Sequence, residues 1–175
     1  MPDRVYNVLF LCTGNSARSI FGEAVLNRLG NGSFRGYSAG SQPKGEVNPM
    51  TLDVLREAGY ATAGLRSKSW DEFATPEAPK MDFVFTVCDD AAKETCPIWP
   101  GQPMTAHWGI EDPAAAEGTE FQRRAAFQDA MRFMRNRITA FVNLPHASID
   151  HLTLRGKLQG IGTMDGASVR APQVA

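Results

Sequence analysis

The stretch that decides the fold is Val8-Leu9-Phe10-Leu11, then Cys12-Thr13-Gly14-Asn15-Ser16-Ala17-Arg18, then Ser19-Ile20-Phe21-Gly22-Glu23-Ala24-Val25-Leu26. An apolar run, a short polar loop and an amphipathic segment predict a buried strand, a tight loop and the start of a helix. Such a loop points several backbone N–H groups at one spot, where the helix dipole adds partial positive charge. The sequence therefore predicts a loop over residues 12–18 that binds a phosphate-like anion.

Two side chains indicate what this loop does with the anion. Arg18 carries a planar, permanently charged fork that matches a tetrahedral oxyanion. Cys12 is expected to be held there as a thiolate, the nucleophilic form, with Ser19 donating to its sulfur. Gly14 is expected to adopt a backbone conformation that side chains oppose, and Asn15 a left-handed one. The predicted oxyanion-binding set is Thr13, Gly14, Asn15, Ser16, Ala17, Arg18 and Ser19. The alternative for Cys12, a buried apolar residue at a strand end, fits this surrounding pattern less well.

Composition narrows the class of protein. The chain has 175 residues, 43% of them hydrophobic and 21% charged, which is typical of one soluble globular domain. A formal net charge of −1 gives no nucleic-acid or acidic-membrane footprint. The N-terminus lacks the apolar core and cleavage site of a signal peptide, and no apolar stretch approaches membrane-spanning length. We therefore expect a cytoplasmic protein, with no nucleic-acid or membrane partner, whose three cysteines stay reduced.

Strand and helix patterns alternate along the chain. Strands are expected at 5–11, 34–38, 82–87 and 103–107, and helices at 18–29, 49–58 and 119–143, with a short helix after Ser69. This alternation predicts an α/β fold, a three-layer sandwich with a central four-stranded parallel sheet flanked by helices. Residues 1–145 are expected to form the domain. Residues 146–175 are expected to form an extension outside the compact core, with a helix over 148–158 and a flexible tail from about Gly162. The arginines of the long helix are expected on its solvated face.

Three more residues extend the predicted site. In parallel sheets ligands bind at the carboxyl ends of strands, so Cys12 and Cys88 are expected to face one crevice. The seven residues between Cys88 and Cys96 do not suit zinc and favour a redox pair, with two unrelated buried cysteines as the alternative. Asp112, held extended by Pro113, is a candidate general acid, although Asp-Pro is also a common turn pair.

With these pieces placed, the chain resembles the arsenate reductases that share the low-molecular-weight protein tyrosine phosphatase fold. The resemblance rests on residues 12–19, on Tyr37-Ser38-Ala39-Gly40, on Cys88 with Cys96-Pro97-Ile98, and on His107-Trp108-Gly109-Ile110-Glu111-Asp112-Pro113-Ala114. It implies a thiol relay: Cys12 attacks arsenate held by Arg18, Asp112 assists the departing oxygen, Cys88 resolves the Cys12 adduct, and Cys96 takes over the disulfide. It also implies a dithiol partner, thioredoxin, which restores the pair.

The resemblance leaves other possibilities open. The Cys88–Cys96 spacing is one residue longer than in thioredoxin-linked relatives, so glutaredoxin with glutathione is the alternative electron donor. No bound cofactor is expected, except that some family members hold a potassium ion, for which the matching positions are Asn15, Glu23, Ser38 and Asp71. A phosphatase acting on phosphomonoesters is the second candidate function, although Ala114-Ala115-Ala116 lacks the aromatic wall of such phosphatases. A non-catalytic oxyanion-binding or redox-sensing protein is the third.

Overall fold

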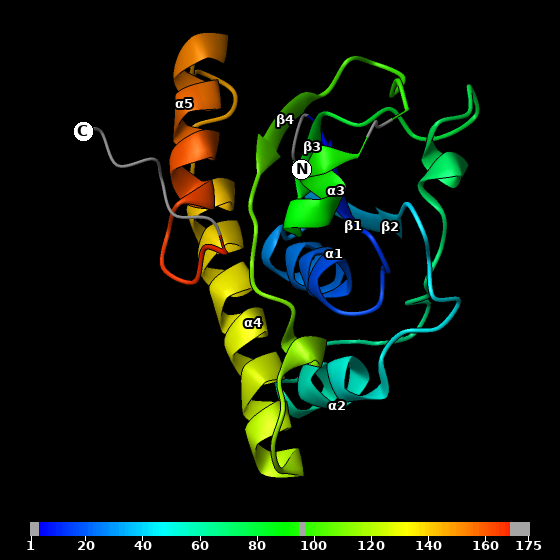
Figure 1. Ribbon diagram of the computed structural model, residues 1–175. Coiled ribbons are helices and arrows are strands. Elements are labelled where there is room, and N and C mark those ends of the chain that lie inside the picture. The colour runs from blue at the N-terminus through cyan, green and yellow to red at the C-terminus, as the bar shows by residue number, and fades with distance from the viewer. Residues whose placement is uncertain (1–3, 95–96, 169–175) are drawn as a thin grey trace.

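The computed structural model describes residues 4–94 and 97–168 (Figure 1). Its centre is a sheet of four strands, β1 (Tyr6–Cys12), β2 (Phe34–Gly40), β3 (Phe83–Thr86) and β4 (Met104–His107). The strands lie in the order β2-β1-β3-β4, and all neighbouring pairs are parallel. Their carboxyl ends therefore lie along one edge of the sheet. The expected α/β fold with a four-stranded parallel sheet is confirmed.

The helices are α1 (Arg18–Leu29), α2 (Pro49–Glu57), α3 (Asp89–Lys93), α4 (Glu120–Val142) and α5 (His151–Gly162), with two 3-10 turns, η1 (Trp70–Phe73) and η2 (Pro113–Ala115). Their starts follow local capping chemistry. The Asn48 side chain accepts from Met50 N at the start of α2, and Thr119 forms a capping box with Gln122 at the start of α4. These local signals are why the sequence placed α2 and α4 to within about two residues, whereas α1, which has no side-chain cap, was predictable from its helical periodicity and from Gly30 at its end.

The sheet is covered on both faces, because successive strand residues point to opposite sides. Val8 and Phe10 belong to the main core, which includes residues of α1, α4 and α5. Leu9 and Leu11 face a smaller cluster, together with residues from η1 and the segment around Trp99. In Figure 1 the long helix α4 runs past α1 and alongside α5. None of the helices in the described part of the chain is long and apolar enough to cross a membrane.

The C-terminal extension is part of the main core, and the expectation that it lies outside is wrong for α5. Leu154, Leu158 and Ile161 join the main core, and Trp108 Nε1 donates to Leu158 O at 3.0 Å. The helix begins at His151 rather than at Ser148, because the Asp150 side chain caps it by accepting from Thr153 N. Its apolar positions are few, so the sequence alone did not reveal the partner against which they pack.

The chain after α5 also stays on the molecule. Ala167 forms a β-bridge with Ile110, and Ser168 N donates to Gly109 O at 3.1 Å. The flexible tail expected from Gly162 is therefore wrong up to Ser168; residues 169–175 lie outside the described chain.

One arginine of α4 is not solvated. Arg137 is fully buried, whereas Arg135 on the same helix is exposed. The Arg137 guanidinium donates to Phe133 O at 3.1 Å, to Asp165 O at 3.2 Å and to Met164 O at 3.1 Å. The expectation for this residue is wrong because two of its three carbonyl partners come from the segment after α5, which a helical periodicity cannot reveal.

Candidate active site

The predicted anion-binding loop joins the end of β1 to the start of α1. Its carbonyl groups are bonded to the surrounding chain. Thr13 O accepts from Gln42 N, Gly14 O from Lys44 N, and Ser16 O from Asn48 N, each at 3.0 Å. These carbonyl oxygens are held from outside the loop, and the Gly14 N–H bonds the Cys12 sulfur. We therefore expect the N–H groups of the loop to face the enclosed side, which is the arrangement that binds an anion.

Asn15 braces the loop as the sequence predicted. Its φ of 45° is left-handed, its Nδ2 donates to Ser19 Oγ at 2.8 Å, and its Oδ1 accepts from Lys68 N at 2.9 Å. Ser19 therefore contacts Asn15. The expected hydrogen bond from Ser19 to the Cys12 sulfur is not found between these two described residues. Gly14 differs too: it has no left-handed φ, and the space that a Cβ would need is taken by Lys44 Cε at 3.2 Å.

The loop encloses a cavity of about 290 Å³, and the residues that line it come from four segments. They are Cys12, Thr13, Gly14, Ser16, Ala17, Arg18, Gln42, Lys44, Asp90 and Asp112. Gln42 and Lys44 were missed from the sequence, because nothing in the turn after β2 shows that it folds over the loop. The ammonium of Lys44 adds positive charge to a cavity suited to an oxyanion.

Arg18 is fixed by one bond and keeps a donor available. Its Nη1 donates to Ile110 O at 2.9 Å, and its Nη2 lies 3.7 Å from Asp112 Oδ2. Its Nε is buried and finds no acceptor among the residues that the structure describes. A buried donor without a partner is costly, so this N–H is available to an oxyanion in the cavity, as the sequence predicts.

Asp112 lies at the mouth of the same cavity. It caps η2, where its Oδ1 accepts from Ala114 N at 3.0 Å, and its second oxygen faces Arg18. The side chain is 43% exposed, so it can exchange protons with water. The structure thus brings Asp112 to the loop from 94 positions away, while its role as an acid stays a prediction.

Cys88 meets Cys12 at the sheet edge, as the parallel strands predicted. It follows β3, caps α3 and is buried; its sulfur accepts from Ala91 N at 3.4 Å and lies 3.6 Å from Thr13 Oγ1. A hydrogen bond joins the two thiols. It lowers the pKa of Cys88 to about 5, helped by Thr13 and Ala91, and together with burial it raises the pKa of Cys12.

One proton is therefore shared by two sulfur atoms, and the pair carries one negative charge near neutral pH. The expectation that Cys12 is the nucleophilic thiolate stays a prediction: the neighbouring Cys88 thiol and burial raise the pKa of Cys12, whereas Arg18 and the Gly14 N–H lower it.

Cys96, the third cysteine of the expected relay, lies outside the described residues. The ring nitrogens of His107 are both engaged, with Thr86 Oγ1 at 2.7 Å and with Asp89 Oδ1 at 2.9 Å. No group of three or more His, Cys, Asp and Glu suited to a metal ion occurs within residues 4–94 and 97–168.

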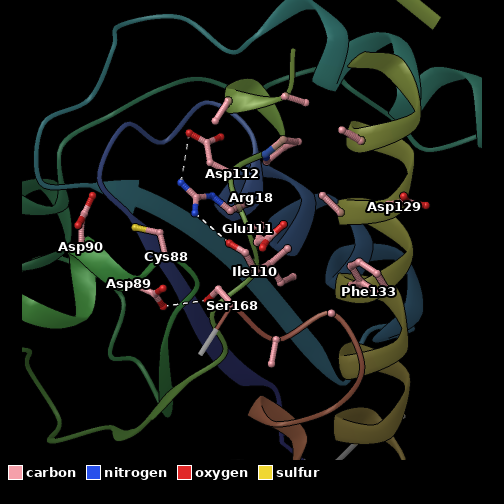
Figure 2. A pocket seen from close by; sticks show the side chains of 17 residues that line it. Arg18, Cys88, Asp89, Asp90, Ile110, Glu111, Asp112, Asp129, Phe133 and Ser168 are labelled. Carbon is pink, nitrogen blue, oxygen red and sulfur yellow. Dashed lines mark hydrogen bonds and ion pairs between the residues drawn. The ribbon is translucent and has the colours of Figure 1, made fainter. Parts of the chain in front are cut away.

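A larger open pocket of about 860 Å³ adjoins the loop (Figure 2). Arg18, Cys88 and Asp112 line it on one side, and Phe133 of α4 lines it on the other. The C-terminal segment forms part of its wall, where Ser168 Oγ donates to Asp89 Oδ1 at 2.8 Å. The bonds from His107 and Ser168 outweigh the effect of burial and lower the pKa of Asp89. Nothing in the sequence indicates that the extension reaches Asp89, the residue next to Cys88.

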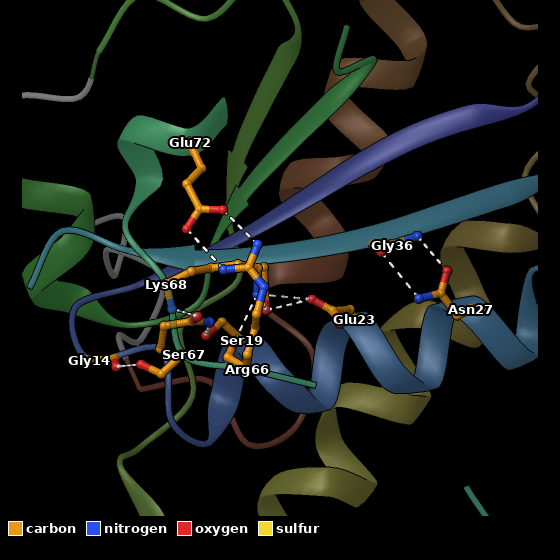
Figure 3. Close-up of polar contacts among 11 residues, drawn as sticks. Gly14, Ser19, Glu23, Asn27, Gly36, Arg66, Ser67, Lys68 and Glu72 are labelled. Carbon is orange, nitrogen blue, oxygen red and sulfur yellow. Dashed lines mark hydrogen bonds and ion pairs between the residues drawn. The ribbon is translucent and has the colours of Figure 1, made fainter. Parts of the chain in front are cut away.

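The four positions matched to a potassium site are only partly gathered. Ser38 Oγ donates to Glu23 Oε1 at 2.8 Å, Asn15 bonds Ser19, and Asp71 lies exposed on η1. The Lys68 ammonium contacts both Glu23 and Ser38: Nζ lies 3.5 Å from Glu23 Oε1 and 3.3 Å from Ser38 Oγ (Figure 3). An ion between Glu23 and Ser38 does not fit beside an ammonium group already bonded there.

The fold and the loop define a class of protein that binds a tetrahedral oxyanion and acts on it through a cysteine at a strand end. Residues 7–143 match the low molecular weight phosphotyrosine protein phosphatase family, and the chain belongs to that family.

Relatives within this family include reductases. An arsenate reductase of Oceanobacillus iheyensis is 36% identical over 134 residues, which are 77% of this chain and 93% of that protein. The structure of an arsenate reductase from Archaeoglobus fulgidus is similar with a TM-score of 0.62 and 26% identity, covering 78% of this chain and 99% of that one. A thioredoxin-dependent arsenate reductase of Corynebacterium glutamicum shares the fold, with a TM-score of 0.53 and 24% identity over 79% of this chain and 64% of that one.

Proposed function

We propose that this protein is an arsenate reductase, which converts arsenate to arsenite through a relay of cysteine thiols. The observation that carries the proposal is the hydrogen-bonded pair of Cys12 and Cys88 at an oxyanion loop with Arg18. A hydrolase needs only the first of these cysteines. A reductase needs a second thiol in reach, because two electrons have to come from two sulfur atoms. The named relatives support the same reaction.

The first step is attack on arsenic. Arsenate binds to the loop N–H groups and Arg18, and the Cys12 proton passes to the Cys88 sulfur. The Cys12 sulfur forms a bond to arsenic, and one oxygen leaves as water with a proton that Asp112 helps to supply. Arg18 stabilises the charge that develops on the remaining oxygens.

The second step is the reduction. Cys88 first releases to water the proton that it took from Cys12, and is then a thiolate again. It attacks the Cys12 sulfur, so that an S–S bond forms and the S–As bond breaks. The electron pair of the broken bond goes to arsenic, which leaves as arsenite, and the two cysteines are oxidised to a disulfide. In the relay Cys96 then attacks Cys88, which frees Cys12 and leaves a Cys88–Cys96 disulfide.

The electron donor is part of the proposal. A dithiol protein of the thioredoxin kind, acting in the cytoplasm where thiols are kept reduced, restores the two cysteines. The Corynebacterium relative is described as thioredoxin-dependent, which supports this choice. Glutaredoxin with glutathione is the alternative.

Phosphomonoester hydrolysis is the second candidate function, because the family is named for phosphatases and the same loop would bind a phosphate group. It needs Cys12, Arg18 and Asp112 but neither Cys88 nor Cys96. None of the residues that line the loop cavity is aromatic, and the aromatic side chain of the adjoining pocket, Phe133, lies on the side away from Arg18. This observation favours arsenate over an aryl phosphate.

The deciding experiment is NADPH consumption on adding arsenate to the protein with thioredoxin and thioredoxin reductase. We expect sustained consumption, and none beyond one turnover in Cys96→Ser, in which a Cys12–Cys88 disulfide accumulates and is seen by mass spectrometry of peptides. If NADPH is consumed only when glutaredoxin and glutathione replace thioredoxin, the proposed reaction stands and the electron donor is glutaredoxin with glutathione. No reduction with either donor, together with phosphate release from a phosphotyrosine mimic, would overturn the proposal in favour of the phosphatase.

A further inference from the structure

A buried lysine that takes no part in the proposed reaction lies beside the anion-binding loop. Lys68 is only 8% exposed. Its Nζ donates to Arg66 O at 2.9 Å and to Ser38 Oγ at 3.3 Å, and lies 3.5 Å from Glu23 Oε1 (Figure 3). Burial lowers its pKa, and the carboxylate of Glu23 opposes that effect. A charged group is kept in such a place only when it has partners there.

The main chain of Lys68 is joined directly to the loop. Its N–H donates to Asn15 Oδ1 at 2.9 Å, and the preceding residue, Ser67, donates through Oγ to Gly14 O at 3.1 Å. Asn15 holds the left-handed turn of the loop and bonds Ser19. Lys68 therefore connects the loop at its backbone to α1 and β2 at its ammonium group.

The carboxylate of Glu23 is the reason that a cation is needed. Its side chain is 13% exposed, and a carboxylate buried to this degree requires a positive partner. Glu23 Oε1, Ser38 Oγ and Arg66 O are oxygen ligands of the kind that a hard cation takes. Nζ contacts all three, so the ammonium fills the position between them. Arg66 itself turns to Glu72, with which it pairs at the surface.

We propose that Lys68 is a positioning residue of the oxyanion loop. Its ammonium group supplies to Glu23 and Ser38 the positive charge that a bound potassium ion would otherwise bring. Through its main-chain N–H the same residue then holds Asn15 in place. The protein then binds oxyanions independently of potassium. The role of Lys68 concerns the binding of an oxyanion by the loop and not the reduction of arsenate. A negative result for Lys68 is therefore distinguishable from a negative result for the proposed function.

The test compares oxyanion binding in potassium chloride and in choline chloride at equal ionic strength. Calorimetry with inorganic arsenate is performed on the native protein, on Lys68→Ala and on Lys157→Ala, an exposed lysine of α5 as the matched control. We expect the native protein and the control to bind equally in both salts. Lys68→Ala should bind about tenfold more weakly in choline, as for one lost charge-assisted interaction, and regain most of that affinity in potassium.

Rescue by potassium separates a missing charge from general damage to the fold, because lost packing does not respond to the identity of the salt. Equal binding by Lys68→Ala and the native protein in choline, or an equally large potassium effect on the native protein, would overturn the proposal. If Lys68→Ala does not fold, the double variant Glu23→Gln with Lys68→Met removes both charges together. We expect it to fold, to bind arsenate about tenfold more weakly and to ignore potassium, whereas native affinity in this variant would refute the role of Lys68.

Discussion

At the scale of single residues, the pair of Cys12 and Cys88 is the centre of the proposed chemistry. Each sulfur is buried, and each acts on the ionisation of the other through one hydrogen bond. The pKa of a lone cysteine in this loop would depend mainly on Arg18 and on the loop amides. With two, the charge belongs to the pair, so removing either cysteine changes the chemistry of the one that remains.

This coupling predicts how the thiols titrate. In a Cys96→Ser background only Cys12 and Cys88 remain, and we expect one thiolate to form near pH 5, seen by ultraviolet absorbance. Above that pH the thiolate persists, and below it the sulfur is protonated. Cys12→Ala removes the bond that lowers the pKa of Cys88 most, so the titration of Cys88 should move up towards an ordinary thiol.

Cys88→Ala in the same background is the control, because the thiolate absorbance that remains there belongs to Cys12 alone. A thiolate that still forms near pH 5 in Cys12→Ala would show that the contact between the two sulfurs is not what lowers the pKa of Cys88.

At the scale of elements, the end of β2 supports the loop. A Cβ placed on Gly40 would lie 2.4 Å from Thr13 O and 3.1 Å from Asn15 Cβ, so the strand approaches the loop as closely as a backbone can. The loop is thus held by β2 on one side and by the segment around Lys68 on the other. Its geometry depends on elements that lie far from it in the sequence.

Gly40→Ala should therefore displace the loop. We expect kcat/KM for arsenate to fall about a hundredfold, because reacting groups are moved by a sizeable part of an ångström while the rest of the fold is kept. Gly156→Ala is the matched control. It lies on α5 with nothing within 4 Å of the added Cβ, and should leave activity intact and raise stability by about 0.5–1 kcal/mol. Native activity in Gly40→Ala would contradict the close approach.

The elements also show what the sequence could reveal. The strand, loop and helix around Cys12 were predictable because their signals are local: an apolar run, a glycine and asparagine, and a helical periodicity. Asn15 was predictable for the same reason. The docking of α5 was not, because it depends on the indole N–H of Trp108, fifty positions away from its acceptor. Lys68 was missed because a single lysine outside the helices and strands carries no sign of the carboxylate that it contacts.

At the scale of the whole molecule, α5 extends one core rather than adding a separate part. Leu158 is fully buried in the main core, whereas Leu152 on the same helix is 77% exposed. Arg137 then ties the segment after α5 back to α4. The family match ends at residue 143, so these contacts are made by chain beyond it.

Leu158→Ala should lower the free energy of unfolding of the whole protein by about 2–5 kcal/mol, because it leaves a cavity in a packed core. Leu152→Ala, with its side chain in water, should change it by no more than about 0.5 kcal/mol. Urea unfolding followed by circular dichroism measures both. Equal effects of the two variants would mean that α5 does not share the core in solution.

The positions of the three tryptophans give the protein a set of built-in optical probes. Trp108 stacks on Phe85, with ring centroids 3.8 Å apart, in the core that α5 completes. Trp70 and Trp99 meet edge to face at 6.3 Å in the cluster on the opposite face of the sheet. Replacing either set with phenylalanine leaves fluorescence from one face alone, so the emission would tell whether the two faces of the sheet loosen together or in turn.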